Sequence, residues 1–136
     1  MKIYKWIFRK VRTTRRRRLS TKSSKVEYQK HKEQARAMVH RKIASFNAFY
    51  NFTFHKVVIR NQRSRWGSCS KKGNLNFNYR LVLIPEVLAD YVIVHELCHL
   101  GEFNHSKNFW NLVAQTIPNH VQLRKQLHKI RFGKIF

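Results

Sequence analysis

The apolar residues of this chain recur at spacings that predict four helices. Residues 26–50 carry apolar side chains at helical intervals, and residues 89–100 form a second, almost wholly apolar helical segment. Residues 106–114 and 121–130 predict two more helices, separated by Pro118, which a helix interior does not accommodate. The pattern therefore predicts one long helix early in the chain and three shorter helices in its second half.

Two segments between the first two helices predict β-strands. Residues 54–60 form a short run of strand-forming residues, and residues 75–83 alternate between apolar and mainly polar side chains, which is typical of a half-buried strand. Residues 61–73 between them are rich in turn-forming residues and include Gly67 and Gly73. The order of elements predicts an α+β class, with a small antiparallel sheet packed on three to four helices.

The charge divides the chain into two parts. The formal net charge of the 136 residues is +23. Residues 1–25 hold eleven Lys or Arg and no acid, including four consecutive arginines at positions 15–18. Residues 26–136 hold eighteen Lys or Arg and six acids. We expect residues 1–25 to form a basic N-terminal lead and residues 26–136 to form a single domain.

This excess of positive charge has two interpretations. A strongly basic chain attracts polyphosphates without sequence specificity, so the lead is a candidate for non-specific nucleic-acid binding. The alternative is a solvated basic surface with no dedicated partner. The sequence carries neither zinc-finger spacing nor a helix-turn-helix signature, which argues against sequence-specific recognition.

The composition is typical of a cytoplasmic globular protein. Apolar residues make up 43% of the chain, enough for a core without disulfide bonds. The two cysteines, Cys69 and Cys98, do not form a disulfide framework, which fits a reducing compartment. No apolar run is long enough for a membrane span or a signal-peptide core. We therefore expect a cytoplasmic protein without a membrane span.

The segment from His95 to His105 carries the clearest chemical signal. It contains an H-E-x-x-H motif, and on a helix His95 and His99 lie one turn apart on one face, with Glu96 beside them. Gly101 indicates a helix stop, after which a turn can bring His105 back as a third ligand. Three protein ligands leave a fourth position for water, which is typical of a catalytic zinc site.

The apolar sequence around the motif supports a metal site over a chance match. A helix of this composition is largely buried, and buried histidine and glutamate side chains need polar partners. A bound metal ion supplies such a partner. The alternative is two core histidines beside an unrelated glutamate. We expect one zinc ion per chain.

An ordered set of motifs spans about residues 43–113. It consists of Arg-Trp-Gly-Ser-Cys-Ser at 65–70, Leu-Asn-Phe-Asn-Tyr-Arg-Leu at 75–81, Pro85, His-Glu-Leu-Cys-His at 95–99, Asn-His-Ser at 104–106 and Phe-Trp at 109–110. This set resembles the YgjP-like metallopeptidases, small zincins related to the WLM and SprT-like proteases. By this resemblance His95, His99 and His105 match the zinc ligands and Glu96 matches the catalytic glutamate. The resemblance implies a zincin-like metallopeptidase domain that contains the H-E-x-x-H helix.

The motif and the resemblance predict zinc-dependent hydrolysis of a peptide or protein substrate. Zinc lowers the pKa of its water toward about 7, and Glu96 is placed to act as general base. Zincins bind peptides beside an edge strand, for which residues 54–60 or 75–83 are candidates. The candidate contacts with the oxyanion or the substrate are Tyr91, Tyr79, Arg80, His120 and Asn76. For each of them the alternative is a purely structural role.

Two other functions compete with this prediction. One is a nucleic-acid-binding protein with a structural metal, but such a site does not need an unligated carboxylate at Glu96 beside a ligand. The other is a protease that nucleic acid recruits to bound proteins, as in SprT-like and WLM relatives. The arginines at 15–18 favour this second alternative only by analogy.

Overall fold

The computed structural model describes residues 21–130, which form four α-helices, three β-strands and a 3-10 helix. These elements confirm the α+β class. Of the expected lead, residues 1–20 lie outside the described residues, whereas residues 21–25 already belong to the first helix. In chain order the elements are α1 (Thr21–Tyr50), β1 (Lys56–Arg60), β2 (Gly67–Cys69), β3 (Asn74–Asn78), η2 (Tyr79–Leu83), α2 (Glu86–Cys98), α3 (Lys107–Thr116) and α4 (His120–Lys129).

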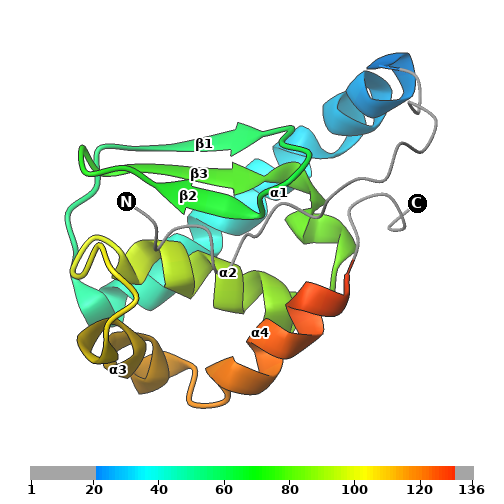
Figure 1. Ribbon diagram of the computed structural model, residues 1–136. Coiled ribbons are helices and arrows are strands. Elements are labelled where there is room, and N and C mark those ends of the chain that lie inside the picture. The colour runs from blue at the N-terminus through cyan, green and yellow to red at the C-terminus, as the bar shows by residue number, and fades with distance from the viewer. Residues whose placement is uncertain (1–20, 131–136) are drawn as a thin grey trace.

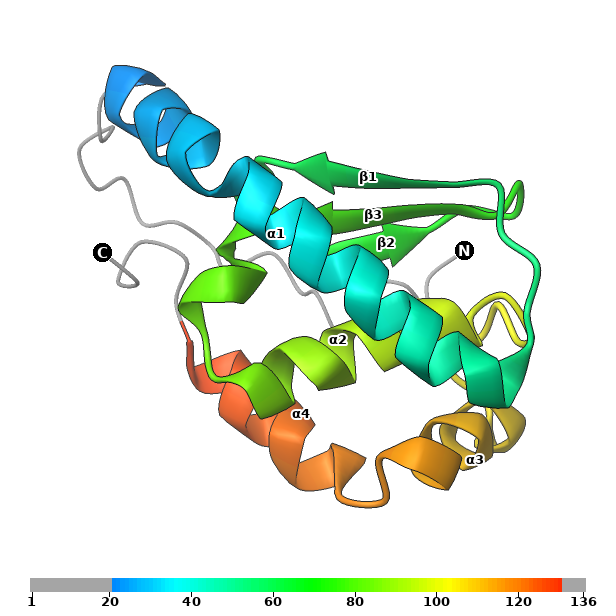
Figure 2. The same cartoon turned by 180° about the vertical axis from the view of Figure 1, so that it is seen from behind.

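Helix α2 runs through the middle of the molecule, with the sheet on one side and α3 and α4 on the other (Figure 1). Seen from the opposite side, helix α1 crosses in front of α2 and the sheet, and it packs on η2, β1 and α2 (Figure 2). Every residue from Tyr91 to Cys98 is buried. A helix that is covered on all sides buries apolar residues all round, which explains why this segment is so uniformly apolar.

The sheet is mixed, whereas the pattern predicted antiparallel pairing throughout. Its strand order is β1-β3-β2, with β2 antiparallel to β3 and β1 parallel to β3. The physical reason is that β2, which was not predicted, forms the hairpin with β3 and occupies its antiparallel edge. Leu75 and Phe77 of β3 are fully buried, so the predicted alternation does define the core face of the sheet.

The predicted strand 75–83 ends at Asn78, and Tyr79–Leu83 form the 3-10 helix η2 instead. The Asn78 side chain accepts a hydrogen bond from the backbone N–H of Arg80 at 3.0 Å, which caps η2. The apolar alternation continues past the strand because Tyr79 and Leu81 of η2 also point into the core.

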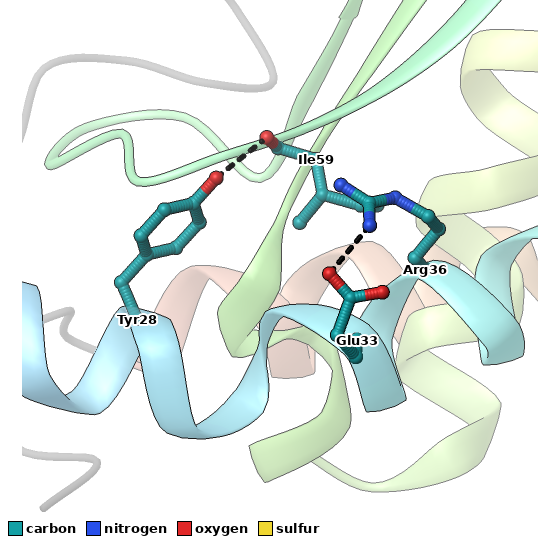
Figure 3. A network of polar contacts seen from close by, with 4 residues as sticks. All are labelled: Tyr28, Glu33, Arg36 and Ile59. Atoms are coloured by element: carbon teal, nitrogen blue, oxygen red, sulfur yellow. Dashed lines mark hydrogen bonds and ion pairs between the residues drawn. The ribbon is translucent and has the colours of Figure 1, made fainter.

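Long-range polar contacts fix α1 against the other layers. The Tyr28 hydroxyl donates to the backbone carbonyl of Ile59 in β1 at 3.3 Å, close to a local Arg36–Glu33 ion pair (Figure 3). The ammonium group of Lys42 contacts Glu86 and Asp90 of α2, each at 2.6 Å.

No helix within residues 21–130 is long and apolar enough to cross a membrane.

Candidate metal centre

Helix α2 presents His95 and His99 to one side from successive turns. Both imidazoles are buried, and their ring centroids lie 4.7 Å apart. Their Nε2 atoms are separated by 3.1 Å. The Nδ1–H of His99 donates to the backbone carbonyl of Glu102 at 3.0 Å, because a carbonyl can only accept. This bond leaves Nε2 of His99 with its lone pair directed at the other histidine.

The chain turns directly after the second histidine. Helix α2 ends at Cys98, whose carbonyl accepts hydrogen bonds from Gly101 and Glu102. Gly101 does not have the positive φ expected of a left-handed helix stop. A Cβ at this position would lie 2.8 Å from the Phe52 ring, so any larger residue would force that ring to move. This close approach lets the turn pack tightly beneath the centre.

The turn returns His105 to the two helical histidines. Its Nε2 lies 3.3 Å from Nε2 of His95, and one ring nitrogen from each of His95, His99 and His105 falls within 4.8 Å of the others. Ser106 then caps α3 by accepting from the N–H of Phe109, which fixes the position of the preceding histidine. Three converging imidazole nitrogens fit a divalent metal ion.

Two aromatic residues of α3 hold the imidazoles in place. Phe109 stacks on His99 with centroids 4.4 Å apart, and Trp110 stacks on His105 at 5.8 Å. The indole of Trp110 also stacks on His120 at 5.1 Å. Apolar rings on this side leave little freedom to the three candidate ligand side chains, which is the arrangement that a preorganised site requires.

Burial controls the charge of the helical histidines. It lowers the pKa of His95 well below its usual value and lowers the pKa of His99 to about 4. Repulsion from neighbouring histidines adds to the effect in both cases. Both imidazoles are therefore neutral near pH 7, which is the state that binds a metal ion.

Glu96 is a buried carboxylate beside this cluster. Its exposed fraction is 1%, and burial raises its pKa to about 8, although the positive charge of Arg65 opposes the shift. Within residues 21–130 its Oε1 atom has no hydrogen-bond partner. A Cβ on Gly67 would lie 3.0 Å from Cγ of Glu96, so β2 passes directly over this side chain.

The fold brings two of the other candidate residues to the centre. Tyr91 is fully buried one turn before His95, with ring centroids 5.8 Å apart, and burial raises the pKa of its hydroxyl. His120 reaches the centre from α4 through its stacking on Trp110. The guanidinium of Arg124, which the sequence did not single out, lies 5.5 Å from the same indole ring.

Tyr79 and Arg80 lie in a different environment. The Tyr79 ring contacts Tyr28 and His31 of α1. The guanidinium of Arg80 donates to the Asn61 side chain at 3.2 Å and to the backbone carbonyl of Gln62 at 3.0 Å. Both side chains therefore brace the junction between α1, η2 and the loop before β2.

Asn76 lies on the outer face of the sheet. Its amide accepts from Nε of Arg60 at 3.3 Å and donates to the Ser68 hydroxyl at 3.3 Å. The neighbouring Phe77 is fully buried, and side chains alternate along a strand, so Asn76 points away from α2.

Strand β2 is the element that sequence reasoning missed. The candidate edge strands were residues 54–60 and 75–83, but β3 is central and β1 lies at the far edge. Strand β2 occupies the edge above Glu96. Its residues Gly67–Cys69 lie in a turn-rich segment and include no β-branched residue, so only the glycine hinted at a close backbone approach.

The backbone N–H and C=O groups of successive residues in and beside β2 point alternately toward β3 and away from it. Trp66 accepts from the N–H of Asn78, and the N–H of Ser70 donates to the carbonyl of Asn74. Hydrogen-bonded and non-hydrogen-bonded pairs alternate in an antiparallel ladder. The N–H and C=O groups of Gly67 and Cys69 therefore point away from β3, toward the open edge of the described sheet.

Comparisons with known proteins agree with this geometry. The model of the YgjP-like, metallopeptidase domain family matches residues 4–130. The metallopeptidase zymogen abylysin of Pyrococcus abyssi is 22% identical, with a TM-score of 0.60 over 65% of this chain and 90% of that chain. The metallopeptidase zymogen jannalysin of Methanocaldococcus jannaschii is 23% identical, with a TM-score of 0.55 over 70% and 94%. These two likenesses concern the fold alone. No curated protein matches the sequence.

Proposed function

Because the chain belongs to the YgjP-like metallopeptidase family, we propose that it hydrolyses peptide bonds with one zinc ion held by His95, His99 and His105. The observation that carries the proposal is the convergence of three imidazole nitrogens within 4.8 Å beside the buried carboxylate of Glu96. Three nitrogen ligands with one open position are typical of catalytic zinc. When bound, zinc acts as a Lewis acid and lowers the pKa of water toward about 7.

Glu96 is proposed as the general base. A carboxylate next to a ligand accepts the proton of the attacking water and passes it to the leaving amine, and Oε1 has no competing hydrogen-bond partner within residues 21–130. Burial favours the protonated carboxyl, but a cation on the three histidines stabilises the charged form that the reaction needs.

Strand β2 is proposed as the platform for the substrate. Its outward N–H and C=O groups at Gly67 and Cys69 can pair with an extended peptide, which is the usual mode of β-augmentation. Gly67 lies against Glu96, so a peptide paired there has its main chain beside the general base. Tyr91 is the proposed hydrogen-bond donor to the developing oxyanion, because it is the buried hydroxyl next to His95.

Metal analysis combined with a peptidase assay tests the proposal. The purified chain should contain one zinc ion, and it should cleave members of a quenched-fluorescent peptide library. The Glu96→Gln variant should keep its zinc and melt like the wild type, but its rate should fall by at least about 10²-fold. Full activity in this variant would remove Glu96 from the mechanism, and zinc-loaded wild type without hydrolysis of any peptide would contradict the function.

A further inference from the structure

The acidic residues are confined to one part of the fold. Residues 51–85, which build the sheet and η2, contain seven Lys or Arg and no Asp or Glu. Residues 103–130, which build α3 and α4, also contain no acid. The layers on both sides of α2 are therefore cationic. All six acids lie in α1, in α2 or in the turn after α2: Glu27, Glu33, Glu86, Asp90, Glu96 and Glu102.

Cations bracket the edge strand at both ends. Arg65 stands two residues before Gly67, and Lys71 stands two residues after Cys69. Both side chains are exposed, as are those of their neighbours Arg63 and Lys72. Gly67 and Cys69 are the positions whose backbone groups face the edge of the sheet that is open within residues 21–130. A peptide paired with them therefore extends past Arg65 at one end and past Lys71 at the other.

Further positive charge approaches the centre from two directions. Arg65 acts electrostatically on the buried carboxylate of Glu96 from the β2 side. The guanidinium of Arg124 lies 5.5 Å from the Trp110 ring, whose centroid is 5.8 Å from that of His105. The metal centre thus has an arginine on the β2 side and another on the α4 side.

We propose that the preferred substrate is an extended peptide segment with Asp or Glu residues on both sides of the scissile bond, bound along β2 between Arg65 and Lys71. The proposal rests on the proposed peptidase function. A peptide fits better than a nucleic acid because a peptide main chain complements the outward N–H and C=O groups of β2, whereas a sugar-phosphate backbone does not.

The first test compares three peptides that differ only in two residue pairs, one on each side of the scissile bond. These four residues are all Glu in the first peptide, all Gln in the second and all Lys in the third. The expected order of kcat/KM is Glu, then Gln, then Lys, with about two- to fivefold for each exposed charge pair. The Arg63→Glu/Arg65→Glu double variant should weaken or reverse the order. The matched control Lys25→Glu/Lys30→Glu, on the exposed surface of α1, changes the net charge equally and should keep the order.

Salt gives an independent readout of the same interaction. The screening length falls from about 10 Å at 0.1 M ionic strength to about 3 Å at 1 M, so the ratio between the Glu and Lys peptides should shrink toward one. Equal kcat/KM for the three peptides, or a preference that the Arg63→Glu/Arg65→Glu variant retains, would overturn the acidic specificity while leaving the peptidase function intact.

A binding experiment separates the two proposals. Zinc-loaded Glu96→Gln protein should bind a labelled Glu-flanked peptide in fluorescence anisotropy more tightly than the Lys-flanked peptide, and Arg63→Glu/Arg65→Glu should abolish the difference. If the wild type cleaves nothing, this result still upholds the acidic specificity of the β2 edge. If the protein binds duplex DNA but binds the Glu- and Lys-flanked peptides equally well, the proposed acidic specificity of the β2 edge is overturned.

Discussion

At the scale of single residues, the centre depends on charge states that burial imposes. The His95 and His99 pair follows from the i, i+4 spacing, so the sequence predicts that they converge. Their neutrality near pH 7 follows only from the packing around α2. The role of Gly101 likewise depends on Phe52, a residue distant in sequence, whose approach no local pattern reveals.

The third proposed ligand, His105, gives the first prediction. Replacing His105 with alanine removes one of three converging nitrogens, and zinc affinity should fall by more than the 10- to 100-fold typical of losing an outer-shell partner. Glu102→Ala is the control, because Glu102 contacts His99 through its backbone carbonyl, which alanine retains. Chelator competition measures both affinities. Zinc loss in Glu102→Ala together with retention in His105→Ala would reassign the ligand.

The raised pKa of Glu96 gives a pH-dependent stability in metal-free protein. Burial raises this pKa from 4.5 to about 8, so between these values the folded state binds more protons than the unfolded state. The free energy of unfolding should therefore fall as pH rises. The loss is clearest between about pH 6.5 and 8, because above about pH 6.5 the buried histidines are mainly neutral in the folded and the unfolded protein alike and no longer change the stability. The expected loss is on the order of 1–2 kcal/mol over that window.

Denaturant unfolding of metal-free Glu96→Gln provides the comparison. Glutamine does not titrate, so its stability should be flat over the same window. A wild type and a variant with the same pH profile would show that Glu96 is not the group that titrates.

At the scale of elements, the sequence predicts the four helices but not the shortest strand, β2. Helices α1 to α4 follow from apolar spacing, because many residues contribute to each pattern. Strand β2 has three residues and owes its conformation to pairing with β3, which is tertiary information. Because β2 was missed, both the parallel pairing of β1 and the edge beside Glu96 were missed with it.

The close approach of β2 to α2 is tested by Gly67→Ala. The added Cβ would lie 3.0 Å from the backbone carbonyl oxygen of Asn76 and 3.0 Å from Cγ of Glu96. A backbone neighbour moves less easily than a side chain, so we expect about 1–3 kcal/mol of destabilisation and a lower kcat. Ser68→Ala is the control, because Ser68 contacts Asn76 on the opposite face. Denaturant unfolding of both variants measures the effect, and equal stabilities would contradict the close packing.

The packing of α3 on the ligands gives another prediction at this scale. Trp110→Ala removes the ring that stacks on both His105 and His120. Truncation of a partly buried aromatic residue should cost a few kcal/mol, and the looser His105 should weaken zinc binding as well. Trp110→Phe preserves an aromatic face and should recover much of the zinc affinity in chelator competition. Wild-type zinc affinity in Trp110→Ala would show that the indole does not position the ligand.

At the scale of the whole molecule, the family and the charge are separate sources of information. Ordered motifs in the sequence were enough to identify the family, which its model confirms over residues 4–130. Charge was visible as a net value of +23, but its meaning depends on where it lies. The acid-free stretches 51–85 and 103–130 are visible in the sequence, but only the fold shows that they form the sheet and α3–α4 on opposite sides of α2.

The basic lead remains a separate candidate for nucleic-acid binding, and helix α1 defines where to cut it. Because α1 begins at Thr21, deletion of residues 1–20 removes the arginines at 15–18 and leaves the described elements intact. If the lead binds duplex phosphates, affinity for duplex DNA should fall, and the slope of log affinity against log salt concentration should become shallower by about 0.9 for each phosphate that is no longer neutralised.

The family match begins at residue 4, so thermal melting must show that the truncated chain stays folded. Replacing the four arginines with glutamine keeps the chain length and should lower affinity in the same direction. Unchanged binding in both variants would place the phosphate-binding cations on the basic surface of the folded elements instead.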